Sequence, residues 1–241
     1  MHRIFYPKEL KERIEINGSK AHKILSVLRM NKEDKILIFD GKGKSQIMKI
    51  EEINREFVSL YAPKNIINKS KNTPEIILAI SLIKPSRFEI AIEKTTELGV
   101  SEIYPMVTQN TNNIFQKRMN EKIIDRMSNI AINAAEQCGN DFIPQIHSPI
   151  ELDKILSLND QETKFILYYE KAKLDIKIDI KIKDYKKVVI LIGPEGGFTE
   201  SEYSQINQKG LVLSLGENIL RTETASICAV HEVNRLIRST L

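Results

Sequence analysis

The sequence has little of what stabilises small secreted domains or metal centres. It contains two cysteines, Cys138 and Cys228, and no tryptophan. Two cysteines provide neither a disulfide framework nor the paired spacing of a zinc site, so no metal is expected. No run of about 20 apolar residues is present to span a bilayer, and residues 1–18 lack the apolar stretch of a secretory signal. These absences predict a reduced cytoplasmic setting and no membrane partner.

The composition is that of a globular protein with an uneven distribution of charge. Of the 241 residues, 41% are hydrophobic and 28% are charged, which suits one large or two small domains. The net charge is +4, but residues 1–73 carry 16 Lys and Arg against 9 Asp and Glu. This basic third favours either a polyanionic partner or simple solvation of a small domain, and charge alone does not decide between them.

The first third has the pattern of a small β-barrel. Strand-like runs occupy residues 3–6, 36–40, 45–50 and 57–61, and the Asp-Gly-Lys-Gly of residues 40–43 is typical of a hairpin turn. A helix that Ser19 could cap interrupts the strands and carries His22, Lys23 and Arg29. Polar residues 63–74 read as a linker. We therefore expect one domain over residues 1–72 and a second over residues 73–241.

From Glu75 onward, strands and helices alternate. Strands are expected at residues 76–82, 102–106, 165–168, 188–192 and 211–215, and helices at residues 87–98 and 117–138. The short runs of branched apolar residues are typical of strands that are buried on both faces. The second domain is thus predicted to be an α/β fold with a parallel sheet.

Two glycine-containing turns follow neighbouring strands and lead into helices. The first turn is GPEGGF at residues 193–198, with capping-box spacing from Thr199 to Glu202, and the second is GENILRT at residues 216–222. Thr222 and Glu223 suggest an N-cap and an acidic first turn for the last helix. Open parallel sheets bind ligands at the edge where such turns lie.

The GPEGGF turn matches neither a Walker loop nor a GxGxxG dinucleotide loop. One interpretation is a tight turn that needs glycine φ angles. Phosphate ligands favour a basic residue or a free helix N-terminus, whereas Glu195 lies inside this turn. A cationic, hydroxyl-rich ligand such as S-adenosylmethionine fits it better.

Longer strings resemble one enzyme family. LIGPEGGFTESE and LSLGENILRTETASICAV are similar to the C-terminal signature of the SPOUT class, and in particular to the RsmE family of 16S ribosomal RNA uridine-N3 methyltransferases. HKILSVLR, EKTTELGVSEIYP and NAAEQCGNDFIP also resemble that family, so the similarity covers nearly the whole chain. Asn218 and Asn140 depart from its pattern, at positions where basic residues are usual.

The resemblance implies a PUA-like RNA-binding β-barrel followed by a trefoil-knotted α/β domain, in a homodimer. It implies methylation of N3 of a specific uridine in 16S rRNA within the 30S subunit, with S-adenosyl-L-methionine as cofactor. The cofactor-binding residues carried over from the motifs, together with two at the end of the 165–168 strand, are Tyr168, Glu170, Ile192, Gly193, Pro194, Gly196, Gly197, Leu215, Gly216, Ile219, Leu220, Thr222 and Thr224. RNA contacts are expected at Arg3, His22, Lys23 and Arg29.

The chemistry of uracil N3 suggests three catalytic candidates. This imide nitrogen must lose its proton before it attacks well, and a guanidinium near O2 or O4 would stabilise the developing charge. We assign that role to Arg221, which could instead pair with a phosphate or with another subunit. Glu195 and Glu223 are candidate proton acceptors or partners of Arg221, and Glu223 could simply favour the helix dipole.

Two other functions compete with this hypothesis. One is a catalytically inert ribosome-binding factor, which the intact cofactor turns disfavour. The other is a SPOUT methyltransferase with another RNA target, such as a ribose hydroxyl of transfer RNA, which the PUA-like N-terminus and the LRTETA string disfavour.

Overall fold

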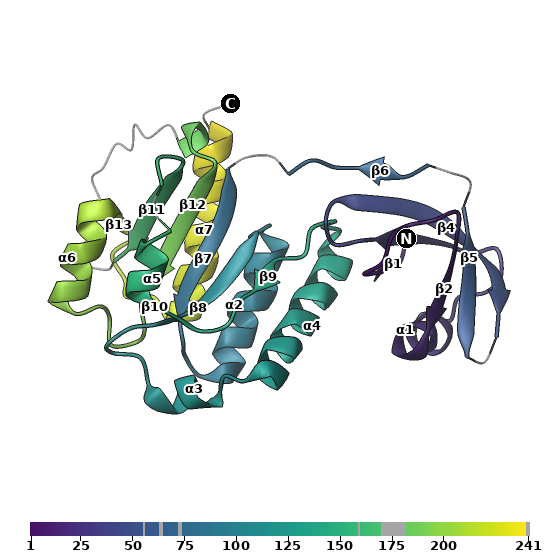
Figure 1. The fold of residues 1–241 in the computed structure, drawn as a ribbon, viewed down its shortest axis with the longest axis horizontal. Helices are drawn as coiled ribbons and strands as arrows, with labels where there is room; N and C mark the ends of the chain where they lie inside the picture. The colour runs from purple at the N-terminus through teal and green to yellow at the C-terminus, as the bar shows by residue number, and fades with distance from the viewer. Residues whose placement is uncertain (55, 63–64, 72–73, 159, 170–181, 240–241) are drawn as a thin grey trace. The chain divides into compact units, whose positions relative to one another are not determined.

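The computed structural model describes residues 1–241 except 55, 63–64, 72–73, 159, 170–181 and 240–241. The chain divides into two compact units (Figure 1). The N-terminal unit contains residues 1–71 and also residues 135–143, which come from the second half of the chain. The C-terminal unit contains residues 72–134 and 144–241. Each unit has its own sheet and its own core.

The N-terminal unit is a curled, mostly antiparallel sheet. The strands lie in the order β1 (Arg3–Phe5), β3 (Lys35–Phe39), β4 (Lys44–Ile53), β5 (Phe57–Tyr61), β2 (Arg13–Asn17), and β6 (Ile67–Asn68) pairs with β4. β1 and β3 are parallel, and the other pairs are antiparallel. Alternate residues such as Ile36, Ile38, Met48, Ile50 and Leu60 are fully buried, so one face of the sheet forms the core. The expected small β-barrel is therefore present as a half-barrel.

The helix of this unit is shorter and less regular than its apolar spacing predicts. α1 (Gly18–His22) continues as a π-helix over Lys23–Val27, and the exposed Arg29 after it has a φ of 52°. A π-helical turn followed by a non-glycine residue at positive φ is uncommon, and such local strain concentrates at functional positions.

The hairpin between β3 and β4 forms as its sequence predicts. Gly43 has a φ of +102°, and a Cβ there would lie 2.5 Å from the carbonyl oxygen of Lys69. Glycine is therefore required at this turn both by the backbone angle and by the close approach of a neighbouring chain segment.

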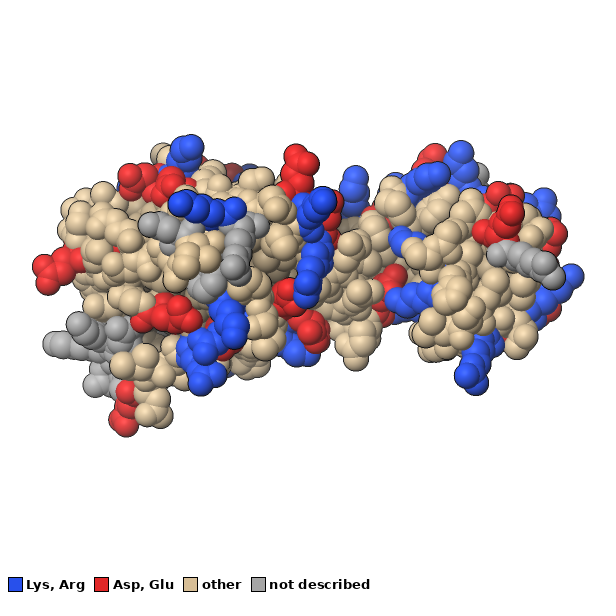
Figure 2. All heavy atoms as spheres, turned by 90° about the horizontal axis from the view of Figure 1, so that it is seen from below, with Lys and Arg blue, Asp and Glu red and all other residues tan. Residues whose placement is uncertain are grey.

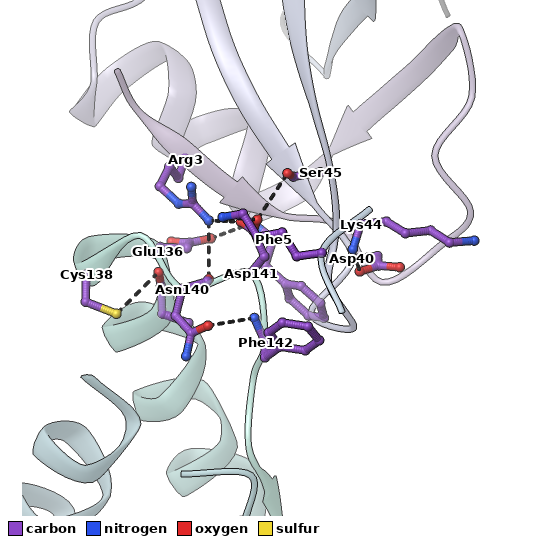
Figure 3. Close-up of polar contacts among 12 residues, drawn as sticks. Arg3, Phe5, Asp40, Lys44, Ser45, Glu136, Cys138, Asn140, Asp141 and Phe142 are labelled. Atoms are coloured by element: carbon purple, nitrogen blue, oxygen red, sulfur yellow. Dashed lines mark hydrogen bonds and ion pairs between the residues drawn. The ribbon is translucent and has the colours of Figure 1, made fainter. Parts of the chain in front are cut away.

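Residues 135–143 complete the N-terminal unit (Figure 3). Glu136 accepts a hydrogen bond from the Phe5 backbone N–H at 2.9 Å and pairs with Lys23 Nζ at 2.5 Å. Asp141 is fully buried and pairs with Arg3 and, at 2.7 Å, with Lys69 Nζ, while Ser45 Oγ donates to it at 3.2 Å. A segment from the second half of the chain thus supplies two carboxylates to the sheet of the first.

The C-terminal unit is built on a parallel sheet. Its order is β10 (Ile150–Glu151), β8 (Glu102–Val107), β7 (Glu75–Ser81), β12 (Lys187–Ile192), β11 (Thr163–Tyr168), β13 (Gly210–Leu213), and β9 (Gln145–Ile146) also pairs with β8. Every pairing in this sheet is parallel. The central strands read IILAIS, KFILY and VVILI and are buried almost throughout, which confirms the predicted parallel α/β architecture.

Helices lie against this sheet. α7 (Thr222–Ser239) packs on β7, β12 and α2 (Pro85–Glu97), whereas α6 (Glu200–Lys209) packs on β11 and β13, and α5 (Leu152–Leu156) on β8 and β10. Gly99, with a φ of +86°, follows α2 as its sequence predicts. A short 3₁₀ turn spans Ile182–Asp184. Within the described residues, every helix is too short or too polar to cross a bilayer.

The single helix expected at residues 117–138 is wrong in its first part. The structure has α3 (Asn113–Arg118) and then α4 (Glu121–Cys138), because Met119 adopts an extended backbone with ψ of 97°. Asn112 and Asn120 accept hydrogen bonds from the backbone N–H groups of Ile114 and Ile123, so each short helix has its own cap. Asn120, which caps α4, lies inside the range expected to be one helix, whereas Asn112 lies before it.

Candidate active site

The two glycine-containing turns lie next to each other at the carboxyl edge of the parallel sheet. Residues 193–198 follow β12, and residues 214–221 follow β13 and lead into α7. Thr222 Oγ1 donates a hydrogen bond to the Gly193 carbonyl oxygen at 3.2 Å. The sequence suggested that Thr222 caps the last helix. In the structure Thr222 is the first residue of α7, and its hydroxyl joins the two turns.

An open pocket lies against the second turn. Its volume is about 330 Å³, including the solvent at its mouth. It is lined by the two tyrosines that end β11, Tyr168 and Tyr169, by the turn residues Ser214, Leu215, Gly216, Asn218 and Leu220, and by Ala225 of α7. Gly216 has a φ of +135°, a backbone angle that glycine adopts readily. Five of the eight lining residues thus belong to the second turn, and the backbone of a turn can offer hydrogen-bonding groups to a ligand.

Tyr168, one of the lining residues, has a buried hydroxyl. The residue is 8% exposed, and its oxygen has no hydrogen-bond partner among the described residues. Burial, reinforced by the nearby Glu232 carboxylate, raises the pKa of Tyr168 well above its usual range. The charges that act on this hydroxyl, Glu232 and Arg235, belong to the second half of α7, whereas the pocket is lined by Ala225 in its first half.

The first turn is held by a loop that follows β8. Asn110 Nδ2 donates to the carbonyl oxygens of Gly196 at 3.2 Å and Gly197 at 3.0 Å. The Gln109 backbone N–H donates to Glu202 Oε1 at 2.8 Å, and Glu202 also closes the predicted capping box with Thr199. The loop after β8, which is 86 positions away in sequence, therefore holds the GPEGG backbone directly through Asn110 and the start of α6 through Gln109.

Arg87, in the first turn of α2, joins two of the predicted catalytic residues. Its Nη1 lies 2.9 Å from Oε1 of Glu195, which belongs to the GPEGGF turn. Its Nε lies 3.7 Å from Oε1 of Glu223, which is the second residue of α7. Both glutamates were candidate partners of Arg221. The structure gives them Arg87 instead, and the exposed Arg221 side chain makes no hydrogen bond or ion pair with any residue that the structure describes.

Family models match both parts of the chain. Residues 69–234 match the model of the RNA methyltransferase domain, which covers more than half of the chain. This chain belongs to the RNA methyltransferase family. Residues 16–60 of this RNA methyltransferase match the model of the RNA methyltransferase PUA domain, which identifies the curled half-barrel of the N-terminal unit as a PUA domain.

Several relatives of this RNA methyltransferase are named ribosomal RNA small subunit methyltransferase E. Ribosomal RNA small subunit methyltransferase E of Buchnera aphidicola subsp. Acyrthosiphon pisum is 31% identical over 89% of this chain and 85% of its own length. A methyltransferase structure from Legionella pneumophila with the bound cofactor S-adenosylmethionine is 31% identical, with a TM-score of 0.82 over 97% of this chain and 96% of that one. Ribosomal RNA small subunit methyltransferase E from Neisseria gonorrhoeae, bound to S-adenosylmethionine, is 26% identical, with a TM-score of 0.83 over 98% of each chain.

Most residues expected to bind a cofactor fall on the two turns or the pocket of this RNA methyltransferase. Ile219, in the second turn, is 81% exposed, which is unusual for a large apolar side chain. Gly193 lies so close to the buried Phe198 ring that a Cβ would be 2.9 Å from its Cε2. Glu170 lies outside the described residues. The residues that line the pocket or form the turns are Tyr168, Gly193, Pro194, Gly196, Gly197, Leu215, Gly216, Ile219 and Leu220, with Ile192 ending β12 and Thr222 and Thr224 in the first turn of α7.

The residues expected to bind RNA divide into two groups. His22 and Arg29 are exposed beside the π-helical turn. Arg3, whose side chain is 13% exposed, is paired with Asp141, and Lys23 is paired with Glu136. Figure 2 shows basic side chains spread over the N-terminal unit on this face, with acidic side chains between them.

Sequence reasoning missed Arg87 and Asn110. Each looks like an ordinary surface residue, because one lies in the first turn of an amphipathic helix and the other in a polar loop. Their roles depend on the parallel order β8-β7-β12, which brings the ends of β7, β8 and β12 to one edge of the sheet. The available signal was position, since both residues follow predicted strands at that edge.

Proposed function

We propose that this chain transfers a methyl group from S-adenosylmethionine to N3 of one uridine in the 16S rRNA of the 30S ribosomal subunit. Family membership, the shared name of its relatives and two similar structures with S-adenosylmethionine bound support this function. The observation that carries it is the contact from Thr222 Oγ1 to Gly193 O, which joins the first glycine turn to the helix that follows the second, and residues of the second turn line the pocket.

The pocket fits this methyl donor. The second turn, which supplies most of the lining, can offer backbone groups to the hydrogen-bonding edges of an adenosine, and Leu220 and the exposed Ile219 offer apolar surface to its base. S-adenosylmethionine supplies an electrophilic methyl group on a sulfonium. The residues that would hold it are those of the two turns together with Tyr168, Thr222 and Thr224.

Arg221 is proposed to face the substrate. Its guanidinium is exposed and has no partner among the described residues, so it is free to meet the negative charge that develops on uracil O2 or O4. The same freedom suits a phosphate contact. Glu195 and Glu223 are the candidate proton acceptors, and Arg87 holds both of them.

The PUA domain is proposed to bind the RNA backbone. Lys and Arg recognise phosphate and shape more than sequence, so the site on an assembled 30S subunit would be selected by folded RNA. His22 and Arg29 are the exposed candidates for contact, whereas Arg3 and Lys23 are engaged in ion pairs.

Further features of the family are part of this proposal. They are a trefoil knot in the domain over residues 73–241, a homodimer and a cytoplasmic location. The parallel sheet with its glycine turns and α7 supports the first of these, and the exposed Ile219 supports an apolar contact in a complex.

Methyl transfer to purified 30S subunits from a strain that lacks the enzyme tests the function directly. We expect one methyl group per particle, which mass mapping of RNase fragments would place on the base of a single uridine at N3. Methylation of a ribose or of transfer RNA would instead identify another target. If calorimetry detects no heat of binding for S-adenosylmethionine, the protein is a ribosome-binding factor and not an enzyme.

Arg221→Ala separates the two roles of this guanidinium. If it stabilises charge on the base, the single-turnover rate falls by a factor of about 100 while the dissociation constant for the 30S subunit is unchanged. If it contacts phosphate, only that dissociation constant rises.

A further inference from the structure

Two buried glutamates in the C-terminal unit differ in how their oxygens are satisfied. Glu202 accepts hydrogen bonds from the Gln109 backbone N–H and from the backbone N–H and hydroxyl of Thr199. Glu223 is as deeply buried, at 8% exposure against 5%, yet its Oε2 is a buried atom with no hydrogen-bond partner among the described residues. Glu202 is thus a completed structural group, and Glu223 has one oxygen left over.

An unpaired oxygen on a buried carboxylate costs free energy and calls for an explanation. The other oxygen, Oε1, faces Arg87 Nε at 3.7 Å, which compensates the buried charge. Glu223 follows Thr222, the residue whose hydroxyl joins the two turns at Gly193. The free oxygen is therefore carried by the helical turn that borders the proposed methyl-transfer site.

Glu195 is unlike Glu223 in the same network. Its side chain is 52% exposed and takes the closer contact with Arg87, at 2.9 Å from Nη1. Water can solvate its remaining oxygen, so nothing about Glu195 is left unsatisfied. Arg87, with its side chain 33% exposed, reaches both carboxylates through different nitrogens of one planar guanidinium. The guanidinium is planar, so its hydrogen bond to Glu195 sets the orientation of the nitrogen that faces Glu223 Oε1.

We propose that Glu223 Oε2 accepts the proton of uracil N3, and that Arg87 is the residue that positions Glu223 for this step. The inference rests on the proposed function. As N3 bonds to the methyl carbon, its proton passes to Glu223 Oε2, and the carbon–sulfur bond breaks with both electrons going to sulfur. The carboxylic acid then loses its proton to water. Arg87 does not touch the substrate and acts only through Glu223, with Glu195 steadying the guanidinium from the solvent side.

A double-mutant cycle tests both parts of this inference. Glu223→Gln keeps the shape of the side chain and removes its ability to accept a proton, so the single-turnover rate on 30S subunits should fall by a factor of about 100 or more. Arg87→Gln should lower the same rate by about tenfold, and in the Glu223→Gln background it should lower it no further. Arg87→Lys keeps the charge without the fork and should recover part of the loss.

Binding and folding are measured alongside the rate. The dissociation constant for S-adenosylmethionine, from calorimetry, should change by less than about threefold in each variant, since neither side chain lines the pocket. The matched control is Arg126→Gln, which breaks the exposed ion pair between Arg126 and Glu89 of α2 and should behave as the wild type in all three assays.

Four results would overturn all or part of this proposal. A Glu223→Gln rate within about threefold of the wild type overturns the proton-acceptor role, and losses that multiply in the double variant overturn the coupling to Arg87. A rate loss matched by an equal loss of cofactor affinity would show that the pair merely supports the turns, and would also overturn the proposal. If the wild type itself methylates no 30S subunit, the proposed function fails, and this inference falls with it.

Discussion

Replacing Asp141 by Asn should destabilise the N-terminal unit more than any surface change. The Asp141 side chain is 0% exposed, and it compensates the guanidinium of Arg3, whose side chain is 13% exposed (Figure 3). Lys69 Nζ, at 2.7 Å, is 51% exposed and can be solvated when its partner is lost. The main cost of the substitution is thus the uncompensated buried charge of Arg3.

The size of this effect follows from that burial. Removing one member of a buried ion pair costs about 3–5 kcal/mol, and the exposed Lys69 adds at most about 1 kcal/mol. Asn can still accept a hydrogen bond from Ser45 or Arg3, so we expect the lower end, about 3 kcal/mol. In a chain of this length, that corresponds to a decrease in Tm on the order of 10 °C.

The effect should depend on pH with a definite sign. Burial would raise the pKa of Asp141, but its hydrogen bonds and charge interactions with Lys69 and Arg3 outweigh burial and lower it. A carboxyl whose pKa is lower in the folded state stabilises the fold above its unfolded pKa of about 3.9. This stabilisation is lost as the pH falls through the folded pKa, so the wild type and Asp141→Asn should converge below about pH 4.

Urea unfolding followed by far-ultraviolet circular dichroism at pH 7 and at lower pH measures these differences. The matched control is Glu51→Gln, which removes the exposed pair with Arg13 and should change the free energy of unfolding by less than about 1 kcal/mol. If Asp141→Asn lowered it by no more than Glu51→Gln, or if its effect persisted unchanged at pH 3, the electrostatic account of this segment would be refuted.

Three further substitutions test the site. Gly193→Ala would push against the buried Phe198 ring, so we expect a loss of about 1–3 kcal/mol in stability and weaker binding of S-adenosylmethionine by calorimetry. Thr199→Ala removes the cap of α6 and should lower the free energy of unfolding by about 1 kcal/mol in a urea titration, with no change expected if the box with Glu202 were unimportant. Tyr168→Phe removes a buried hydroxyl that has no partner among the described residues, so thermal melts should show no loss of stability, whereas calorimetry should show weaker cofactor binding if that hydroxyl meets the ligand.

The features that the sequence predicts well are those set by local signals. The capping box from Thr199 to Glu202, the turn at Gly43 and the helix end at Gly99 all form as expected, because each depends on a few neighbouring residues. The buried strands are also predicted, since their apolar runs are typical of a parallel sheet. Local competition explains the failure at α3 and α4, where Asn112 and Asn120 start new helices.

The contacts that the sequence could not predict join residues far apart in the chain. Arg87 lies 108 positions from Glu195, and nothing near either residue announces the pair. Asn140, which departs from the family pattern, has a local role instead. Its Oδ1 accepts from the Phe142 N–H at 3.0 Å, and its backbone oxygen accepts from Arg3 at 3.2 Å. The turn that contains Asn140 therefore still binds Arg3, although this position usually has a basic residue in the family.

The same long-range contacts change how the basic charge of the first third should be interpreted. Counted along the sequence, residues 1–71 have a formal charge of +7, but the compact unit also contains Glu136 and Asp141, which lower it to +5. Those two carboxylates pair with Arg3, Lys23 and Lys69. These three cations are therefore engaged in ion pairs that stabilise the fold. The charge available to a phosphate backbone lies with exposed residues such as Arg29. RNA affinity should accordingly fall in Arg29→Ala without loss of stability, whereas in Arg3→Ala the two should fall together.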